Sequence, residues 1–138
     1  MKTVIAATAL ITMLSTSVIF GQAKAYQDEI PNVSFCGAMN QNDKIRYSDL
    51  ENCDEVLQPY KELKIKSFTL AYMIPSPEGK GGVFVDFPNT GGKLNQQTLD
   101  ALKTLKDKNV KKIMIEAVVV LEANGTERKM KGINISLE

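Results

Sequence analysis

The sequence contains no histidine. Histidine is the commonest general base and a member of the Ser-His-Asp and Cys-His nucleophilic systems, so its absence excludes those forms of catalysis. Neither sign of charge is in large excess, because 17 basic residues stand against 16 acidic ones. Nucleic acids and anionic membranes call for a strong basic excess. We therefore expect no nucleic-acid partner, and the sequence indicates no cofactor and no metal ion.

Two residue patterns still allow hydrolytic chemistry. Ser67 follows Lys66, and Ser76 lies near Lys80, so Ser-Lys dyads are conceivable. Adjacent residues of a strand point to opposite faces, which argues against the first pair. A second possibility is a carboxylate pair of the glycosidase type, drawn from the acidic residues Asp86, Glu116 and Glu127.

The segment "EGKGGV" is weakly similar to a phosphate-binding loop. It lacks the Lys-Ser/Thr ending and a following helix, so the Walker pattern fails. We predict a protein without catalytic residues, and keep a small envelope hydrolase with a Ser/Lys or carboxylate site as the alternative. A further alternative is a ligand-binding or inhibitor module that uses the loop of residues 75–82.

The only long apolar run lies at the N-terminus. Lys2 precedes an uncharged run from Val4 to Phe20, and Ala23 and Ala25 then fit the small-x-small cleavage rule. The run is short for a membrane span of about 20 apolar residues and contains Thr and Ser. We predict a signal peptide at residues 1–25 and a periplasmic or secreted protein of the Gram-negative envelope, with no membrane span after cleavage. Residues 26–138 are then enough for one domain.

Only two cysteines are present, Cys36 and Cys53. Exported chains meet oxidising conditions, so we predict a disulfide between them. The closed loop of about 18 residues would stabilise the fold by roughly 3 kcal/mol. Free thiols or metal ligation are the alternatives, and a zinc site would need carboxylates to complete it.

Strand patterns dominate the central part of the sequence. Residues 63–74 alternate at period two, residues 83–87 form a shorter strand, and the segments 75–82 and 88–92 are rich in turn formers. Residues 95–108 predict the one substantial helix, with Asn95 as its N-cap. The leucine stripe of this helix is narrow, so we expect it to pack against the sheet.

A β-hairpin closes the chain. In the strand "KKIMIEAVVVLE" the odd-numbered residues from Ile113 to Leu121 are expected on one face and the even-numbered ones on the other. Asn124-Gly125 predicts a type I′ turn, in which both residues have φ > 0. We also expect a β-bulge at Lys131-Gly132 that places Ile115 opposite Ile135. Short strands, turns and one helix together predict a mainly β protein with an immunoglobulin-like β-sandwich fold.

Four segments in sequence order carry a resemblance to a known family. They are "IKSFTLAY", "NTGGKLNQQTLDALKTLK", "KKIMIEAVVV" and "NGTERKMKGINI", which together cover roughly residues 63–135. In this arrangement the chain resembles the C-terminal periplasmic modules of the GldM family, which serves gliding motility and type IX secretion. The resemblance implies an immunoglobulin-like β-sandwich, a Gram-negative envelope setting, and binding without enzymatic activity.

We therefore expect a protein partner in the envelope. Arg128, Lys129 and Lys131 lie on the last strand, where they would protect an edge from aggregation or attract an acidic partner. Tyr47 and Tyr60 stand among polar residues and are candidates for exposed anchors or for residues that cap the edge of the core. These five residues are the predicted partner contacts.

Overall fold

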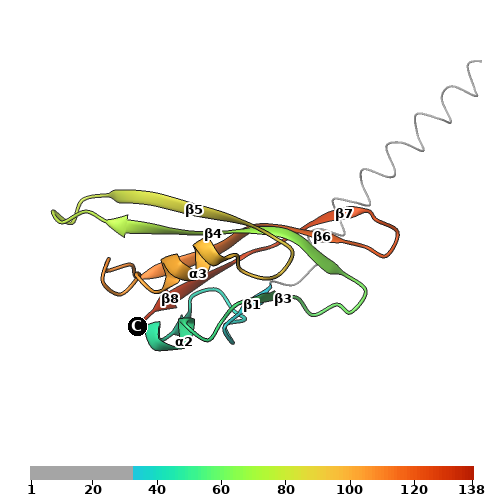
Figure 1. Ribbon diagram of the computed structural model, residues 1–138, viewed down its shortest axis with the longest axis horizontal. Helices are drawn as coiled ribbons and strands as arrows, with labels where there is room; N and C mark the ends of the chain where they lie inside the picture. The colour runs from blue at the N-terminus through green and yellow to red at the C-terminus, as the bar shows by residue number, and fades with distance from the viewer. Residues whose placement is uncertain (1–32) are drawn as a thin grey trace, which may run out of the picture. The chain divides into compact units, whose positions relative to one another are not determined.

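The computed structural model describes residues 33–138 (Figure 1), so the predicted signal peptide lies outside the described residues. In chain order the elements are β1 (Ser34–Phe35), β2 (Asp43–Ile45), α2 (Tyr47–Leu50), β3 (Val56–Leu57), β4 (Lys64–Pro75), β5 (Gly82–Thr90), α3 (Gln96–Leu102), β6 (Lys112–Leu121), β7 (Glu127–Met130) and β8 (Ile133–Leu137). Within this part of the chain, no helix has the length and apolar character needed to cross a membrane.

The strands form a large sheet and a small one. The large sheet has the order β2-β8-β6-β4-β5, with β7 also paired to β6, and the small sheet joins β1 to β3. All neighbours are antiparallel except β2 and β8, which pair parallel. The predicted fold class is confirmed: the chain is mainly β, ends in a hairpin-like strand pair and is consistent with a β-sandwich. The short helix α2 was not predicted.

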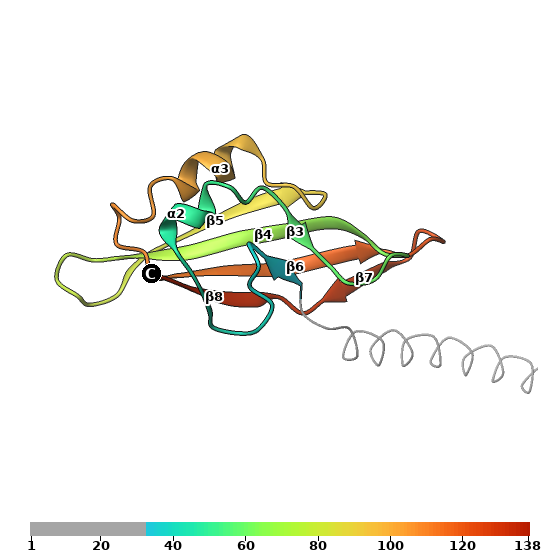
Figure 2. The ribbon, with the colours of Figure 1, turned by 90° about the horizontal axis from the view of Figure 1, so that it is seen from below.

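The core lies on one face of the large sheet. Both helices and the small sheet lie on this side (Figure 1), and the view from below shows them spread across it (Figure 2). Strands of the large sheet contribute buried side chains to this inner face: Phe68, Leu70, Tyr72, Ile113, Ile115, Val118, Val120, Ile133 and Ile135. The covering layer contributes Val33, Phe35, Leu50, Val56, Leu102 and Leu105. Burial of these side chains is the main stabilising contribution to the fold.

The inward and outward alternation of side chains along β6 is interrupted in the middle of the strand. The expected assignment of residues to the two faces is therefore wrong for its second half. Ile113 and Ile115 are buried, Glu116 and Ala117 are both exposed, and Val118 is buried again. Ala117 has a φ of 51°, and the pairing of β4 with β6 shifts register at this place. The irregularity keeps apolar residues of both halves on the inner face, whereas strict alternation would have turned Val118 outward.

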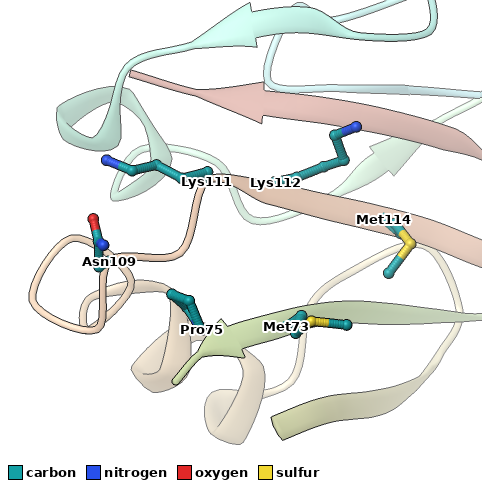
Figure 3. A pocket seen from close by; sticks show the side chains of 6 residues that line it. All are labelled: Met73, Pro75, Asn109, Lys111, Lys112 and Met114. Atoms are coloured by element: carbon teal, nitrogen blue, oxygen red, sulfur yellow. The ribbon is translucent and has the colours of Figure 1, made fainter. Parts of the chain in front are cut away.

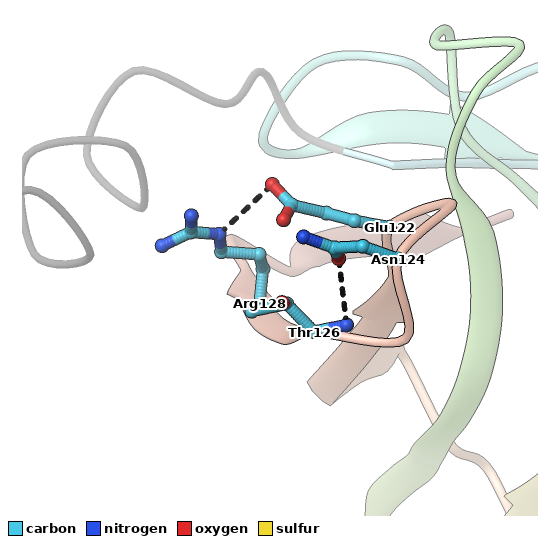
Figure 4. Close-up of polar contacts among 4 residues, drawn as sticks. All are labelled: Glu122, Asn124, Thr126 and Arg128. Atoms are coloured by element: carbon cyan, nitrogen blue, oxygen red, sulfur yellow. Dashed lines mark hydrogen bonds and ion pairs between the residues drawn. The ribbon is translucent and has the colours of Figure 1, made fainter.

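The closing hairpin has a longer loop than predicted. Only Gly125 has a positive φ, 85°, so the Asn124-Gly125 pair does not form the expected type I′ turn. The backbone N–H of Glu122 donates to the carbonyl of Thr126 at 2.9 Å, which leaves three loop residues between them. Such loops place glycine in the left-handed region. The side chain of Asn124 also accepts from the N–H of Thr126 at 2.9 Å (Figure 4).

This loop sets the register, and the predicted bulge is wrong. Ile115 lies opposite Ile133 rather than Ile135, and the β6–β7 pairing continues the same register without an extra residue in the returning strand. The ladder is interrupted at Lys131-Gly132, where no strand residue is assigned. The register correction that we placed at Gly132 is made by the longer loop instead.

Helix α3 begins as predicted and ends early. The side chain of Asn95 accepts from the N–H of Thr98 at 2.9 Å, so the N-cap is confirmed. After Leu102 the chain continues in turns to Asn109, which has a φ of 57°. The N–H of Val110 donates to the carbonyl of Leu105 at 3.0 Å, which closes a Schellman-type end just after residue 108, where the sequence predicted the helix to stop.

Strand β5 is longer than predicted, because Pro88, Asn89 and Thr90 continue it instead of starting the turn. Pro88 lies opposite Thr69 at the edge of the sheet. Proline cannot donate to a ladder and is tolerated in an edge strand where its nitrogen faces away from the neighbouring strand.

The predicted disulfide between Cys36 and Cys53 is present, with the two α-carbons 5.4 Å apart. Cys36 and Gly37 have φ values of 55° and 83°, and mutual backbone hydrogen bonds of 3.0 and 2.9 Å join Phe35 to Ala38. Two positive φ angles in a two-residue turn are the signature of type I′. The turn type that we expected at Asn124 thus occurs at Cys36, and the disulfide links it to the segment before β3.

Candidate binding surface

The face of the large sheet opposite the core, which we call the outer face, is not covered by any element within residues 33–138 (Figure 1). Its side chains follow from the strand registers. Met73 of β4 lies opposite Phe84 of β5. Two residues along, Ala71 lies between Met114 of β6 and Asp86 of β5. The outer face therefore carries a group of apolar side chains at the end of the sheet nearest the β4–β5 loop.

A hollow of about 310 Å³ opens at this end of the outer face. It forms where the β4–β6 ladder stops at the pair Tyr72–Ile113, while β4 continues to Pro75 and, of the described strands, pairs there with β5 alone. Figure 3 shows the residues that line this hollow: Met73, Pro75, Asn109, Lys111, Lys112 and Met114. The two methionines come from neighbouring strands, and the lysines from the start of β6 and the residue before it. We call this site the basic hollow.

Both lysines of the basic hollow are available to a partner. Lys111 and Lys112 are exposed, and neither forms an ion pair with any of the described residues. Ion pairs in that part of the chain involve other cations, with Lys66 bound to Glu127 and Arg128 to Glu122. Lysine ammonium groups beside apolar walls favour a ligand that offers a carboxylate and an apolar group together.

Large apolar side chains are exposed around the basic hollow. Met73 is 50% exposed and Phe84 is 52% exposed, and the two lie opposite each other on the outer face. Val83, which is 64% exposed, lies opposite Ile74 and points to the other face of the sheet. Single exposed apolar residues are ordinary, but a contiguous group on one face is typical of an interaction site. Met39 and Leu57, which are similarly exposed, lie in other parts of the chain, near β2 and in β3.

The three predicted basic contacts lie on or after β7, an edge strand that pairs with β6 alone among the strands of residues 33–138. Arg128 is partly buried, and its Nε donates to Glu122 Oε1 at 3.1 Å (Figure 4). Lys129 and Lys131 are exposed. An arginine already engaged in this way is less suited to recruit an acidic partner than the two lysines.

The two tyrosines lie apart from each other. Tyr47 is partly buried, its hydroxyl donates to the carbonyl of Val110 at 2.6 Å, and its backbone N–H bonds to the carbonyl of Glu138. It also lines two further hollows, of about 400 and 270 Å³, beside α2 and the segment after α3. Tyr60 precedes β4, and its N–H donates to Gln58 Oε1 at 2.6 Å. The structure does not gather the five predicted contacts into one patch, and their contact role stays a prediction.

The residues considered for hydrolysis are not brought into a shared site. Ser76 donates its hydroxyl to the carbonyl of Lys80 at 2.7 Å, inside the β4–β5 loop. Lys66 is engaged with Glu127. Asp86 and Glu116 lie exposed on β5 and β6, which are separated by β4. In the described residues, no three His, Cys, Asp or Glu side chains are grouped as metal ligands.

Comparison with models of known protein families finds no match, and comparison with curated proteins finds none either. The resemblance to GldM modules therefore stays a prediction from the sequence motifs. Sequence reasoning missed the basic hollow because it depends on where the β4–β6 ladder ends. One signal was visible: Met73 and Met114 fall on the strand faces that also carry Thr69 and Glu116, where a solvent-exposed face is expected to be polar.

Proposed function

We propose that this chain is an exported, non-catalytic protein-interaction module of the bacterial envelope, and that its basic hollow binds an acidic segment of a partner protein. The observation that carries the proposal is the pairing of two apolar side chains, the exposed Met73 and the partly buried Met114, with two lysines that lack ion-pair partners among the described residues. The absence of histidine from the sequence and the resemblance to GldM modules support a binding role over a catalytic one.

The geometry of the hollow supports a protein segment as the occupant. The hollow lies at the surface, beside the end of β4 and the start of β6, whereas sites for small molecules enclose most of their ligand. An apolar side chain of a partner would displace water from Met73 and Met114, which is favourable by roughly 25 cal/mol per Å² buried. Neighbouring carboxylates would then form charge-assisted hydrogen bonds with Lys111 and Lys112.

Export is supported by the disulfide and by the predicted signal peptide. Disulfides persist in oxidising compartments and are rare in the cytosol of most organisms. The Cys36–Cys53 bond joins two segments of the covering layer, so it contributes to the fold that the outer face depends on. A periplasmic or secreted location follows as part of the proposal.

Site-specific photocrosslinking tests the proposal. A benzophenone amino acid is placed at Met114, which lines the basic hollow, and in a separate variant at Leu57, which is 54% exposed on β3. Both full-length chains are expressed in the native envelope and irradiated. We expect a discrete protein adduct from position 114 that is absent from position 57, and expect it to decrease when Lys111 and Lys112 are changed to Glu.

Two results would contradict the proposal. One is a set of adducts that is the same at both positions, which would indicate random collision. The other is a position-114 adduct that is unaffected by the Lys111→Glu, Lys112→Glu variant, because a hollow that recognises acidic groups depends on its lysines.

A further inference from the structure

One edge of strand β5 is open. Two hydrogen bonds show which residues of β5 direct their backbone N–H and C=O groups toward this edge. The N–H of Ser76 donates to the carbonyl of Gly81 at 3.1 Å, and the N–H of Gly91 donates to the carbonyl of Lys66 at 2.6 Å. Both pairs share the register of the β4–β5 ladder. Hydrogen-bonded pairs alternate along an antiparallel ladder, so the odd-numbered residues of β5 bond to β4. The even-numbered residues direct their N–H and C=O groups away from the sheet.

The chain itself closes one half of this edge. Pro88 has no N–H, and its carbonyl accepts from Asn95 Nδ2 at 3.1 Å. Further along, the carbonyl of Gly92 accepts from the N–H of Val56 at 2.7 Å. The outward backbone groups of Gly82, Phe84 and Asp86 make no hydrogen bond within the described residues. A short open edge therefore remains, with the β4–β5 loop at one end and Pro88 at the other.

We propose that this open edge pairs antiparallel with the same edge of a second copy of the chain, with Phe84 of each copy opposite Phe84 of the other. Gly82 then pairs with Asp86 of the second copy, and Asp86 with Gly82. Every outward N–H and C=O of these three residues finds a partner, and the two large sheets become one continuous sheet. Unpaired strand edges are templates for such pairing.

The sequence of β5 favours this register over the adjacent registers. A shift that places Phe84 opposite Asp86 sets Gly82 against Pro88, which has no N–H and whose carbonyl is already bonded to Asn95. A larger shift in that direction places Asp86 opposite Asp86, and like charges directly opposite are destabilising. A shift the other way moves Asp86 against Lys80 in the loop, beyond the end of the strand. Only the register centred on Phe84 uses the whole open edge.

Side chains support a second copy as the occupant. Phe84 lies opposite Met73 within each chain, so the proposed contact forms an apolar row from one Met73 through both phenylalanines to the other Met73. It buries part of Phe84 and Val83, which are 52% and 64% exposed. The contact is isologous, the commonest symmetry of soluble oligomers. This self-association goes beyond the proposed function and does not depend on it, since its backbone hydrogen bonds are made by β5 and it does not use Lys111 or Lys112, although Met73 is shared with the basic hollow.

Cysteine crosslinking tests the register directly. In a hydrogen-bonded antiparallel pair the α-carbons lie about 5.5 Å apart, within the range of about 4.4–6.8 Å that a disulfide spans. The full chain is expressed with Phe84→Cys or with Asp86→Cys, and the processed protein is purified from the envelope. We expect Phe84→Cys to form a disulfide-linked dimer on a non-reducing gel. Asp86→Cys is not expected to do so, because the two copies of residue 86 are on the order of 13 Å apart along the strand.

Light scattering and hydrogen exchange test the association without a crosslink. We expect the wild type to reach twice the monomer mass as its concentration rises, and the amide exchange of Phe84 and Asp86 to slow in parallel. Phe84→Pro removes an outward N–H at a position where proline is tolerated, as Pro88 shows, so it should stay folded and monomeric. Leu57→Ala, at an exposed apolar residue of β3, should dimerise normally.

Three results would overturn the inference. The first is a wild type that remains monomeric at high concentration, which would leave this edge to a strand of another protein or to none. The second is a dimer that persists in Phe84→Pro. The third is crosslinking by Asp86→Cys that equals or exceeds crosslinking by Phe84→Cys, because the copies would then pair in a different register.

Discussion

Gly132 lies so close to the backbone of Ile115 that there is no room for a side chain at this position. A β-carbon on Gly132 would come within 1.9 Å of the carbonyl oxygen of Ile115, and within 3.2 Å of the α-carbon of Glu116. The approach occurs where the ladder between β6 and its partner strand is interrupted. Gln41 completes the other side of this gap: its Nε2 donates to the carbonyl of Gly132 at 2.9 Å, and its Oε1 accepts from the N–H of Asn134 at 2.7 Å.

Changing Gly132 to Ala should destabilise the protein by at least about 1–3 kcal/mol, because backbone atoms rather than a flexible side chain must move. Lys131→Ala is the matched control, since this neighbour is exposed. Urea unfolding of both variants measures the difference. Equal stability of Gly132→Ala and the wild type would mean that the two strands do not approach so closely.

Ala117 carries backbone strain that glycine would relieve. Its φ of 51° lies in the left-handed region, which costs an L-residue roughly 1–2 kcal/mol. Ala117→Gly removes this cost but adds chain entropy to the unfolded state, so we expect a small gain of up to about 1 kcal/mol. Ala117→Val should lose more than about 1 kcal/mol, because branching at Cβ worsens the strain. Thermal unfolding checks the order Gly, Ala, Val, and Val as the most stable of the three would contradict it.

The disulfide should contribute measurably to stability. Cys36 and Cys53 are separated by 17 positions, and closing a loop of this size stabilises by roughly 3 kcal/mol. We expect the double variant Cys36→Ala, Cys53→Ala to lose about 2–4 kcal/mol of unfolding free energy. A reducing agent should bring the wild type to the same level and leave the double variant unchanged. A wild type that is insensitive to reductant would show that the bond adds nothing.

The carboxyl group of Asp43 makes the free energy of unfolding depend on pH. The backbone N–H groups of Met39 and Asn40 donate to its carboxylate at 3.0 and 2.9 Å, and they hold the pKa of this carboxyl below its ordinary value of 3.8. A lowered pKa means that the folded state binds the proton less tightly than the unfolded state. Its contribution is therefore present above about pH 3.8 and is lost as the pH falls through the lower folded value.

Asp43→Asn tests this dependence. The variant should melt at a lower temperature than the wild type at neutral pH, and the difference should shrink as the pH falls below the pKa of unfolded aspartate. Thermal unfolding between neutral and strongly acidic pH measures both proteins. A difference that is constant across this range would contradict a role for the ionised carboxylate.

Local patterns in the sequence were enough to predict most of the regular structure. The alternation in residues 63–74 anticipated β4, and Asn95 was correctly identified as the helix N-cap because its effect is confined to one turn. The disulfide followed from the presence of just two cysteines. These features depend on neighbouring residues or on elimination, and a single sequence contains that information.

Features that depend on pairing between distant segments were not predictable. The phase change at Ala117 requires knowledge of both β4 and β6, so simple alternation assigned Val118 to the wrong face. The predicted turn type at Asn124 was wrong because the loop has one more residue than a type I′ turn. The preferences of the turn residues alone do not reveal this difference. The basic hollow exists because β4 extends beyond the last residue that it pairs with β6. No motif in either strand indicates where that pairing stops.

The central claim is that the basic hollow recognises an acidic protein segment, and the most direct test is the affinity of the protein that crosslinks to position 114. Binding is measured for the wild type, for Lys111→Glu with Lys112→Glu, and for Lys129→Glu with Lys131→Glu, which tests the competing contact predicted on and after β7. We predict a loss of about tenfold or more for the first pair, with affinity falling as salt rises, and little change for the second. Equal affinity of all three proteins would contradict the claim, and a loss confined to the second pair would move the contact to β7.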